Sequence, residues 1–87
     1  MVVTKVNVFP FQSGLGSVKA LATVELDNSL VLRGLRVQAG TNGLFLSYPV
    51  DPFYKGDDFR TVVAPTTREL REHIENCVLE AYTNAVD

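Results

Sequence analysis

The stretch TTRELREHIENCVLEAYTNAV, residues 66–86, has the pattern of one amphipathic helix. Thr66 and Glu69 have the spacing of a capping box, in which each side chain accepts a hydrogen bond from the backbone N–H of the other residue. Apolar side chains follow at helical spacing and fall on one stripe: Leu70, Ile74, Cys77, Val78, Ala81 and Tyr82. The sequence therefore predicts a C-terminal helix over about 67–85 that packs this stripe against the rest of the chain.

The residues that precede this helix are typical of β-strands. Apolar and polar side chains alternate along the first runs, which indicates strands with one buried face. The expected strands are residues 2–9, 17–27, 30–39, 44–48 and 59–63. Strands in succession followed by one helix favour an α+β fold. We therefore expect one domain over residues 1–87, with a mostly antiparallel five-stranded sheet over about 2–63.

Turn signals separate these expected strands. Asp27-Asn28 and Asn42-Gly43 lie between apolar runs, and such residues accept the left-handed backbone of tight hairpins. Pro10 and the segment 13–16 (Ser-Gly-Leu-Gly) are expected to end the first strand in a loop. Residues 49–58 contain two prolines and a glycine, so a long polar loop is expected there.

Size and composition exclude several classes of protein. The net charge of −2 gives no overall attraction to nucleic acid or to anionic lipid. No apolar run approaches the about 18 residues that cross a membrane, and the N-terminus lacks a signal-peptide pattern, so we expect a cytoplasmic protein without a membrane partner. A chain of 87 residues has a thin core, and a second copy would add buried apolar area. We therefore expect a homodimer, with Phe45, Leu79 and Val86 as candidate interface residues.

The residue types that carry catalysis are nearly absent. His73 and Cys77 are the single histidine and the single cysteine, and they are one helical turn apart. Two ligands do not make a zinc site, and a cysteine within the apolar stripe is expected to be a structural residue rather than a nucleophile. We therefore expect no enzyme activity, no catalytic residue, no metal, no cofactor and no small-molecule substrate.

A group of cations remains as the candidate site. Arg68 and Arg71 lie at the start of the helix, where the helix dipole favours an anion rather than a cation. Lys55 and Arg60 would join them if the preceding loop folded back, and the four residues would then form a phosphate-binding patch. The alternative is structural, because Arg68–Glu72 and Arg71–Glu75 have the spacing of ion pairs on the solvent face.

Residues along nearly the whole chain resemble one family. The most specific segment is Arg36-Val37, Gly40, Asn42-Gly43-Leu44-Phe45-Leu46 and Pro49. The remaining matches are Val3-Thr4-Lys5-Val6, Lys19-Ala20, Thr23-Val24-Glu25-Leu26-Asp27, Phe59-Arg60, Pro65, Ile74, Val78-Leu79 and Tyr82. This pattern resembles the SpoVG family, named after stage V sporulation protein G and also described as septation proteins.

The resemblance implies a function that composition alone does not. SpoVG-like proteins are small bacterial cytoplasmic proteins that form dimers, partly through strand pairing. They bind DNA, and in some cases RNA, and regulate gene expression; the family is linked to sporulation and to the division septum, hence to cell division and the cell cycle. None is known as an enzyme. The implied fold is a sheet with a C-terminal helix.

One departure from the family pattern affects the expected binding. Many members carry a short basic cluster after the position of Pro49, whereas here Lys55 is the one cation of that segment. Fewer phosphate contacts give lower affinity and a shallower salt dependence. Phe53 and Tyr54 follow instead, and they either stack on unpaired bases or cover the sheet edge or the dimer interface. The alternative function is a protein-interaction module in septation or sporulation control that does not contact nucleic acid.

Overall fold

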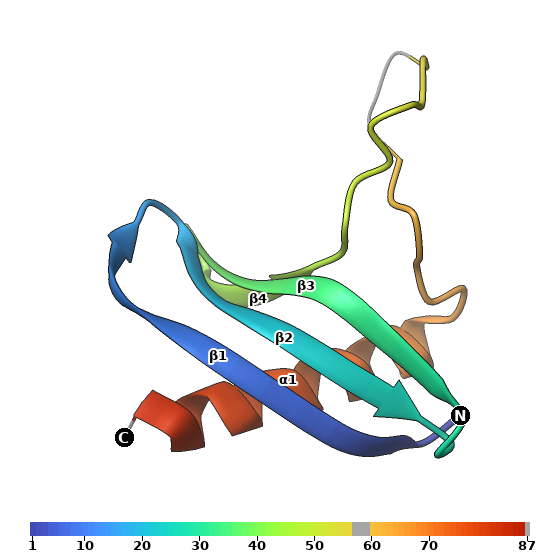
Figure 1. Ribbon diagram of the computed structural model, residues 1–87, viewed down its shortest axis with the longest axis horizontal. Coiled ribbons are helices and arrows are strands. Elements are labelled where there is room, and N and C mark those ends of the chain that lie inside the picture. The colour runs from blue at the N-terminus through green and yellow to red at the C-terminus, as the bar shows by residue number, and fades with distance from the viewer. Residues whose placement is uncertain (57–59, 87) are drawn as a thin grey trace.

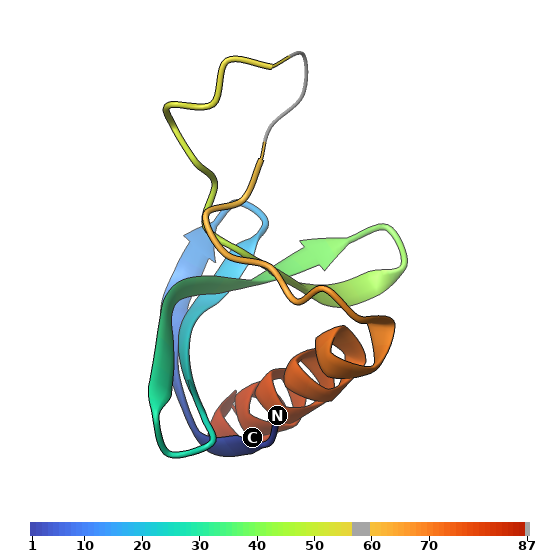
Figure 2. The same ribbon diagram turned by 90° about the vertical axis from the view of Figure 1, so that its right-hand side faces the viewer.

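Four antiparallel strands and one helix make up the fold (Figure 1). The computed structural model describes residues 1–56 and 60–86, and for 12–15 it describes the backbone alone. The elements are β1 (Val3–Leu15), β2 (Val18–Leu26), β3 (Leu30–Gly40), β4 (Gly43–Ser47) and α1 (Arg68–Val86). The sheet has the strand order β1-β2-β3-β4 and curls around α1, which lies along its concave face (Figure 2). The predicted α+β class, with an antiparallel sheet and a C-terminal helix, is confirmed.

The core lies between the concave face and α1. Cross-strand neighbours on this face are apolar, as in the row Val8–Ala22–Leu35. The buried residues of the described chain are Ala20, Ala22, Val24, Leu26, Leu32, Leu35, Val37, Leu46, Ile74 and Val78. Ile74 and Val78 are the buried residues of α1 and belong to the predicted stripe. The alternation of the strands therefore sets which face receives the helix.

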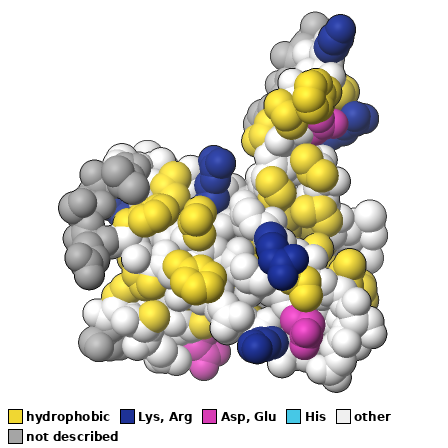
Figure 3. Space-filling view, in the orientation of Figure 1, with side chains coloured by type: hydrophobic (Ala, Val, Ile, Leu, Met, Phe, Trp, Pro, Cys, Tyr) yellow, Lys and Arg dark blue, Asp and Glu magenta, His cyan; other side chains and the backbone are white. Residues whose placement is uncertain are grey.

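The convex face of the sheet turns away from α1. Figure 3 shows this face, where hydrophobic side chains lie among arginines and lysines. Phe9, Leu21, Arg36 and Ser47 are successive cross-strand neighbours on it. Phe9 and Leu21 are 58% and 40% exposed, so this row leaves apolar surface in solvent.

Two predicted hairpin turns are present, with one difference in backbone geometry. Asp27 and Asn28 adopt positive φ angles of 53° and 54° between β2 and β3, as expected. Between β3 and β4, Gly40 pairs with Gly43, so that Thr41 and Asn42 form the loop. The positive φ falls on Gly43 (115°) and not on Asn42.

A bulge in β3 brings the chain that follows β4 close to the sheet. Leu32 pairs with Val24 and Leu35 with Ala22, so two residues of β3 stand opposite one residue of β2. The second of these two is Gly34, which has a φ of 79°, a conformation that glycine adopts without steric cost. A Cβ at Gly34 would lie 3.6 Å from the Pro49 side chain, so Pro49 packs directly over the bulge.

Two sequence predictions about element boundaries are wrong. Pro10 does not end the first strand, because β1 continues to Leu15. Since β1 is an edge strand, the missing N–H of proline is tolerated there. The N-cap of α1 is Thr67 rather than Thr66, since the Leu70 N–H donates to Thr67 Oγ1 at 3.2 Å. The helix itself, Arg68–Val86, lies within one residue of the predicted span of about 67–85.

The predicted fifth strand, 59–63, is also wrong as a strand of the sheet. Phe59 lies outside the described residues, and Thr61 forms an isolated bridge with Val50. Residues 49–56 and 60–64, which we call the arm, project away from both the sheet and α1 (Figures 1 and 2). Backbone hydrogen bonds from Asp51 N to Arg60 O (2.7 Å) and from Val62 N to Pro49 O (2.8 Å) join its two sides. The short apolar run therefore pairs within the arm instead of extending the sheet.

Helix α1 also contacts the backbone of both edge strands. His73 Nε2 accepts a hydrogen bond from Val3 N of β1 at 3.3 Å. Glu75 Oε2 accepts one from Leu46 N of β4 at 3.2 Å. Edge strands present unpaired N–H groups that can pair with another chain. At these two positions a side chain of α1 accepts the hydrogen bond from the strand N–H group instead.

Candidate functional site

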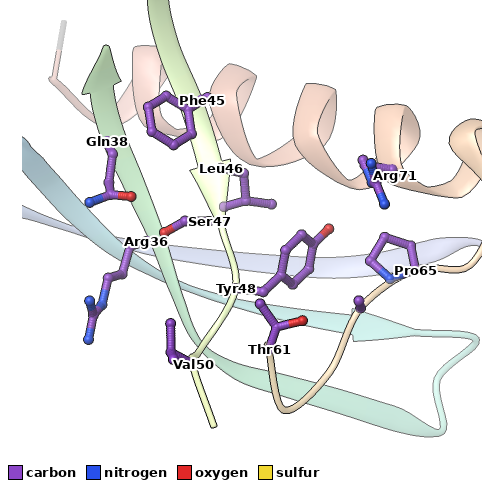
Figure 4. A pocket seen from close by; sticks show the side chains of 11 residues that line it. Arg36, Gln38, Phe45, Leu46, Ser47, Tyr48, Val50, Thr61, Pro65 and Arg71 are labelled. Atoms are coloured by element: carbon purple, nitrogen blue, oxygen red, sulfur yellow. The ribbon is translucent and has the colours of Figure 1, made fainter. Parts of the chain in front are cut away.

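A groove with a volume of about 520 Å³ lies where β4, the arm and the start of α1 meet (Figure 4). We call it the β4 groove. Its lining residues are Arg36, Gln38, Phe45, Leu46, Ser47, Tyr48, Val50, Thr61, Ala64, Pro65 and Arg71. They come from β3, from β4 and the residues that follow it, from the chain before α1 and from α1 itself, and the pairing of β3 with β4 brings the first two of these together.

The β4 groove is positively charged. Its lining contains two arginines and no carboxylate. Arg36 and Arg71 are exposed and lie toward opposite sides of the groove in Figure 4. Neither belongs to an ion pair in the described part of the chain, where the pairs are Arg60–Asp51 and Arg68–Glu72. The groove is therefore a local cationic site on a chain with a net charge of −2.

The predicted pairing of Arg71 with Glu75 is absent. The Glu75 carboxylate instead accepts the Leu46 N–H at the edge of β4, which leaves the Arg71 guanidinium without a carboxylate partner among the described residues. The predicted pairing of Arg68 with Glu72 is confirmed, with Arg68 Nε 3.1 Å from Glu72 Oε1. Of the two arginines in the first helical turns, Arg68 is therefore paired with a carboxylate, whereas Arg71 is available to bind an anion.

Tyr48 contributes an unusual polar group to the β4 groove. Its hydroxyl points toward Arg71 and Pro65 (Figure 4), is closed to solvent, and has no hydrogen-bond partner in the described structure. Burial raises the pKa of Tyr48 above 10.0; Glu75 also raises this pKa, and Arg71 opposes the shift. The hydroxyl is therefore protonated at neutral pH and is available as a hydrogen-bond donor.

The structure separates the four predicted phosphate contacts. The arm does not fold back on the helix, so its outer part, which carries Lys55, lies far from the start of α1 (Figures 1 and 2). Arg60 is held on the arm by Asp51 at 3.2 Å, and its guanidinium lies 4.5 Å from the centre of the Tyr54 ring. Arg68 is on α1, and of the four only Arg71 lines the β4 groove. Their roles as phosphate contacts remain a prediction.

The predicted stacking and interface residues occupy different surfaces. Phe53 is 85% exposed on the arm, whereas Tyr54 is beneath Arg60. Phe45 lines the β4 groove, and Val86 is exposed near the end of α1. Leu79 is partly buried against the core, so part of its surface is already used within the chain. Stacking and dimer contacts at these residues also remain predictions.

Sequence reasoning missed two residues of the groove. Arg36 was visible as a cation on the third strand, but its proximity to Arg71 depends on how the sheet, the arm and the helix pack. Tyr48 carried no signal, because an unpaired buried hydroxyl is a property of the folded chain alone.

A family model for SpoVG matches residues 1–84. The chain belongs to the SpoVG family. It is 41% identical over 80 residues to a septation protein SpoVG of Archaeoglobus fulgidus, with 92% of each chain covered. It is 40% identical over 82 residues to one of Bdellovibrio bacteriovorus, covering 94% of this chain and 73% of the relative. A third SpoVG relative, from Symbiobacterium thermophilum, is 46% identical over 69 residues, which are 79% of this chain and 49% of that protein.

The SpoVG relatives are named as septation proteins and not as enzymes. Residues 1–56 and 60–86 contain no group of three or more histidine, cysteine, aspartate or glutamate side chains placed to hold a metal ion. No helix in the described part of this SpoVG chain is long and apolar enough to cross a membrane.

Asp51 is expected to make the order of the arm pH-dependent. The Phe53 N–H donates to this carboxylate at 2.9 Å and Arg60 at 3.2 Å, and these two contacts lower its pKa below the ordinary 3.8. Because the folded-state pKa is lowered, the contribution to arm stability is complete above pH 3.8 and is lost as the pH falls through the lowered pKa. We expect the NMR amide signals of Phe53 and Arg60 to be constant at neutral pH and to shift only in strong acid.

Two variants provide the control for this expectation. Asp51→Ala, which removes both contacts, should shift the same amide signals at neutral pH. Asp51→Asn keeps an oxygen acceptor for the Phe53 N–H and should shift the Phe53 signal less. Arm signals that are the same in Asp51→Ala and in the parent protein would show that this carboxylate does not hold the arm.

Proposed function

We propose that this chain is a dimeric nucleic-acid-binding regulator, of DNA and also of RNA, that acts in the control of sporulation and septation. The observation that carries the proposal is the β4 groove, in which Arg36 and Arg71 lie among neutral side chains with no lining carboxylate. Nucleic-acid affinity depends strongly on arginine and lysine contacts to phosphates. The names of the SpoVG relatives support the link to septation.

The remaining predicted cations have a supporting role in this proposal. Lys55 and Arg60 on the arm and Arg68 on α1 would contact phosphates beyond the groove, and such contacts position a nucleic acid without reading its sequence. A dimer doubles every cationic site and allows two grooves to contact one ligand, which increases the overall affinity. Leu79 and Val86 are its proposed interface residues, whereas Phe45, the third interface candidate from the sequence, lines the β4 groove and is assigned to that site instead. The oligomeric state is checked by light scattering of the purified protein.

Removing the groove arginines is expected to weaken nucleic-acid binding and its salt dependence. Each phosphate contact that is lost should reduce the slope of log affinity against log salt by about 1. Arg36→Ala/Arg71→Ala should therefore reduce the slope by about 2 if each arginine contacts one phosphate. Fluorescence anisotropy titrations against labelled DNA and RNA at several salt concentrations measure the slope.

Arg33→Ala is the matched control for these variants. Arg33 is an exposed arginine of the same strand, but it lies outside the β4 groove, near Lys5 and Glu25 on the convex face. It should change the slope less than the double variant Arg36→Ala/Arg71→Ala. Equal slopes for Arg33→Ala and the double variant would exclude the groove as the phosphate site.

The second candidate function is a protein-interaction module in septation or sporulation control. The arm favours it, because Val50, Phe53 and Val62 are 50%, 85% and 66% exposed on a projecting segment. Figure 3 shows hydrophobic side chains along the arm. Partners that survive nuclease treatment, together with no binding to any DNA or RNA probe, would select this function over the first.

A further inference from the structure

We infer that the β4 groove holds one unpaired nucleotide, so that the protein binds single-stranded nucleic acid in preference to duplex. The inference rests on the proposed nucleic-acid binding and adds the form of the ligand. Its basis is the combination, in one groove, of two arginines, an exposed aromatic ring and an unsatisfied hydroxyl.

The size of the groove is compatible with a single nucleotide. A volume of about 520 Å³ lies within the range of about 300–1,000 Å³ that is typical of sites for small ligands. Bases of a duplex are stacked inside it, so a base reaches such a pocket only after it leaves the stack, at a cost in free energy. A base that is already unpaired does not incur that cost.

Phe45 provides the surface on which a base can stack. Its side chain is 42% exposed, and its ring lies against Gly40, where an added Cβ would be 3.0 Å from the ring carbon Cε1. Gly40 therefore allows the close approach that holds the ring in place. Aromatic side chains bind any base through the π-face, which makes stacking tolerant of sequence.

Polar side chains line the same groove as this ring. Gln38 is the cross-strand partner of Phe45, so its amide lies beside the ring and is available to the edge of a base. Arg36 and Arg71, on opposite sides of the groove (Figure 4), are available to the phosphates on either side of that base. The arrangement combines a cationic path for the backbone with a stacking platform.

Tyr48 supplies a test that combines two measurements, the stability of the free protein and its affinity for a nucleotide. Its hydroxyl has no hydrogen-bond partner among the described residues, and the exposed Arg71 side chain next to it can move as a ligand enters. A ligand oxygen that reaches the hydroxyl would then satisfy it. Tyr48→Phe should therefore leave the free protein at least as stable in urea, because it removes an unsatisfied polar group, and yet weaken nucleotide binding.

The experiment compares strands that differ only in pairing. Fluorescein-labelled oligothymidylate is titrated by anisotropy, alone and annealed to its oligoadenylate complement, with oligouridylate as the RNA form. We expect the single strands to bind at least about 10-fold more tightly than the duplex, because extruding a base costs a few kcal/mol. Phe45→Ala should weaken single-strand binding by about 5- to 100-fold and duplex binding much less. Phe45→Tyr, which keeps an aromatic ring, should retain most of the affinity.

The remaining outcomes distinguish a failure of the inference from a failure of the proposed function. Equal affinity for single strand and duplex, unchanged by Phe45→Ala, would overturn the inference and leave nucleic-acid binding in place. A loss in Phe53→Ala instead of Phe45→Ala would overturn it by assigning stacking to the arm. An affinity of Tyr48→Phe equal to that of the parent would remove the hydroxyl from the site. No binding of any probe would overturn the proposed function itself.

Discussion

Leu35→Ala is expected to lower the free energy of unfolding by about 2–5 kcal/mol, toward the upper end of this range. Leu35 is 0% exposed and is among the largest fully buried side chains. Its cross-strand neighbour on the core face is Ala22, whose small side chain cannot fill the cavity that the variant creates. A domain of this size is only marginally stable, so the loss is a large part of the total. Urea unfolding followed by circular dichroism measures it.

Leu21→Ala is the matched control for this effect. The same atoms are removed from the neighbouring strand β2, but Leu21 is 40% exposed on the convex face. Leu21→Ala should lower the free energy of unfolding by no more than about 1 kcal/mol, because little buried surface is lost and no cavity forms. If the two variants were equally destabilised in the isolated protein, the convex face would be buried in solution, which would place it in an interface between copies of the chain.

Glu75→Ala is expected to destabilise the fold by about 1–3 kcal/mol through the backbone of β4. The Glu75 carboxylate accepts the N–H of Leu46, a residue that is 7% exposed, and alanine would leave this buried donor without a partner. The same change would free the edge of β4 at that position for pairing with another strand. Urea unfolding gives the stability, and light scattering at increasing protein concentration gives the association.

Two further variants separate the hydrogen bond from the charge. Glu75→Gln keeps an acceptor for Leu46 N and should retain most of the stability. Glu72→Ala removes a carboxylate from the exposed ion pair with Arg68 and should cost at most about 0.5 kcal/mol. If Glu75→Gln were as unstable as Glu75→Ala, the charge of Glu75, and not its contact with Leu46, would be the stabilising feature.

The elements of this fold were predictable where a pattern within one segment determines them. The stripe that contains Ile74 and Val78 gave the helix, because the periodicity of a helix is set by its own residues. The end of β1 was not predictable from Pro10, because proline is tolerated on an edge strand and the strand order is a tertiary property. Likewise Thr66 and Thr67 are equivalent as caps in the sequence, and only the folded chain shows which one receives the Leu70 N–H.

The candidate site was less predictable than the fold for a related reason. Arg36, Tyr48 and Arg71 come from β3, from the segment after β4 and from α1, and only packing brings them to one groove. The sequence pattern placed Arg71 in a cationic patch but gave it Glu75 as an ion-pair partner, which the edge of β4 occupies instead. Spacing along a helix predicts which side chains can form an ion pair. It does not predict that a backbone N–H group from another element will bind one of these side chains instead.

The contacts of His73 and Glu75 with the two edge strands have a consequence for synthesis on the ribosome. All four strands precede α1 in the chain, so the sheet leaves the exit tunnel while the helix is still being translated. During that interval the N–H groups of Val3 and Leu46 lack their hydrogen-bond acceptors on α1. Neighbouring nascent chains on the same messenger RNA expose the same unpaired edge groups. Emergence of α1 therefore supplies a side-chain acceptor for one N–H group on each edge strand.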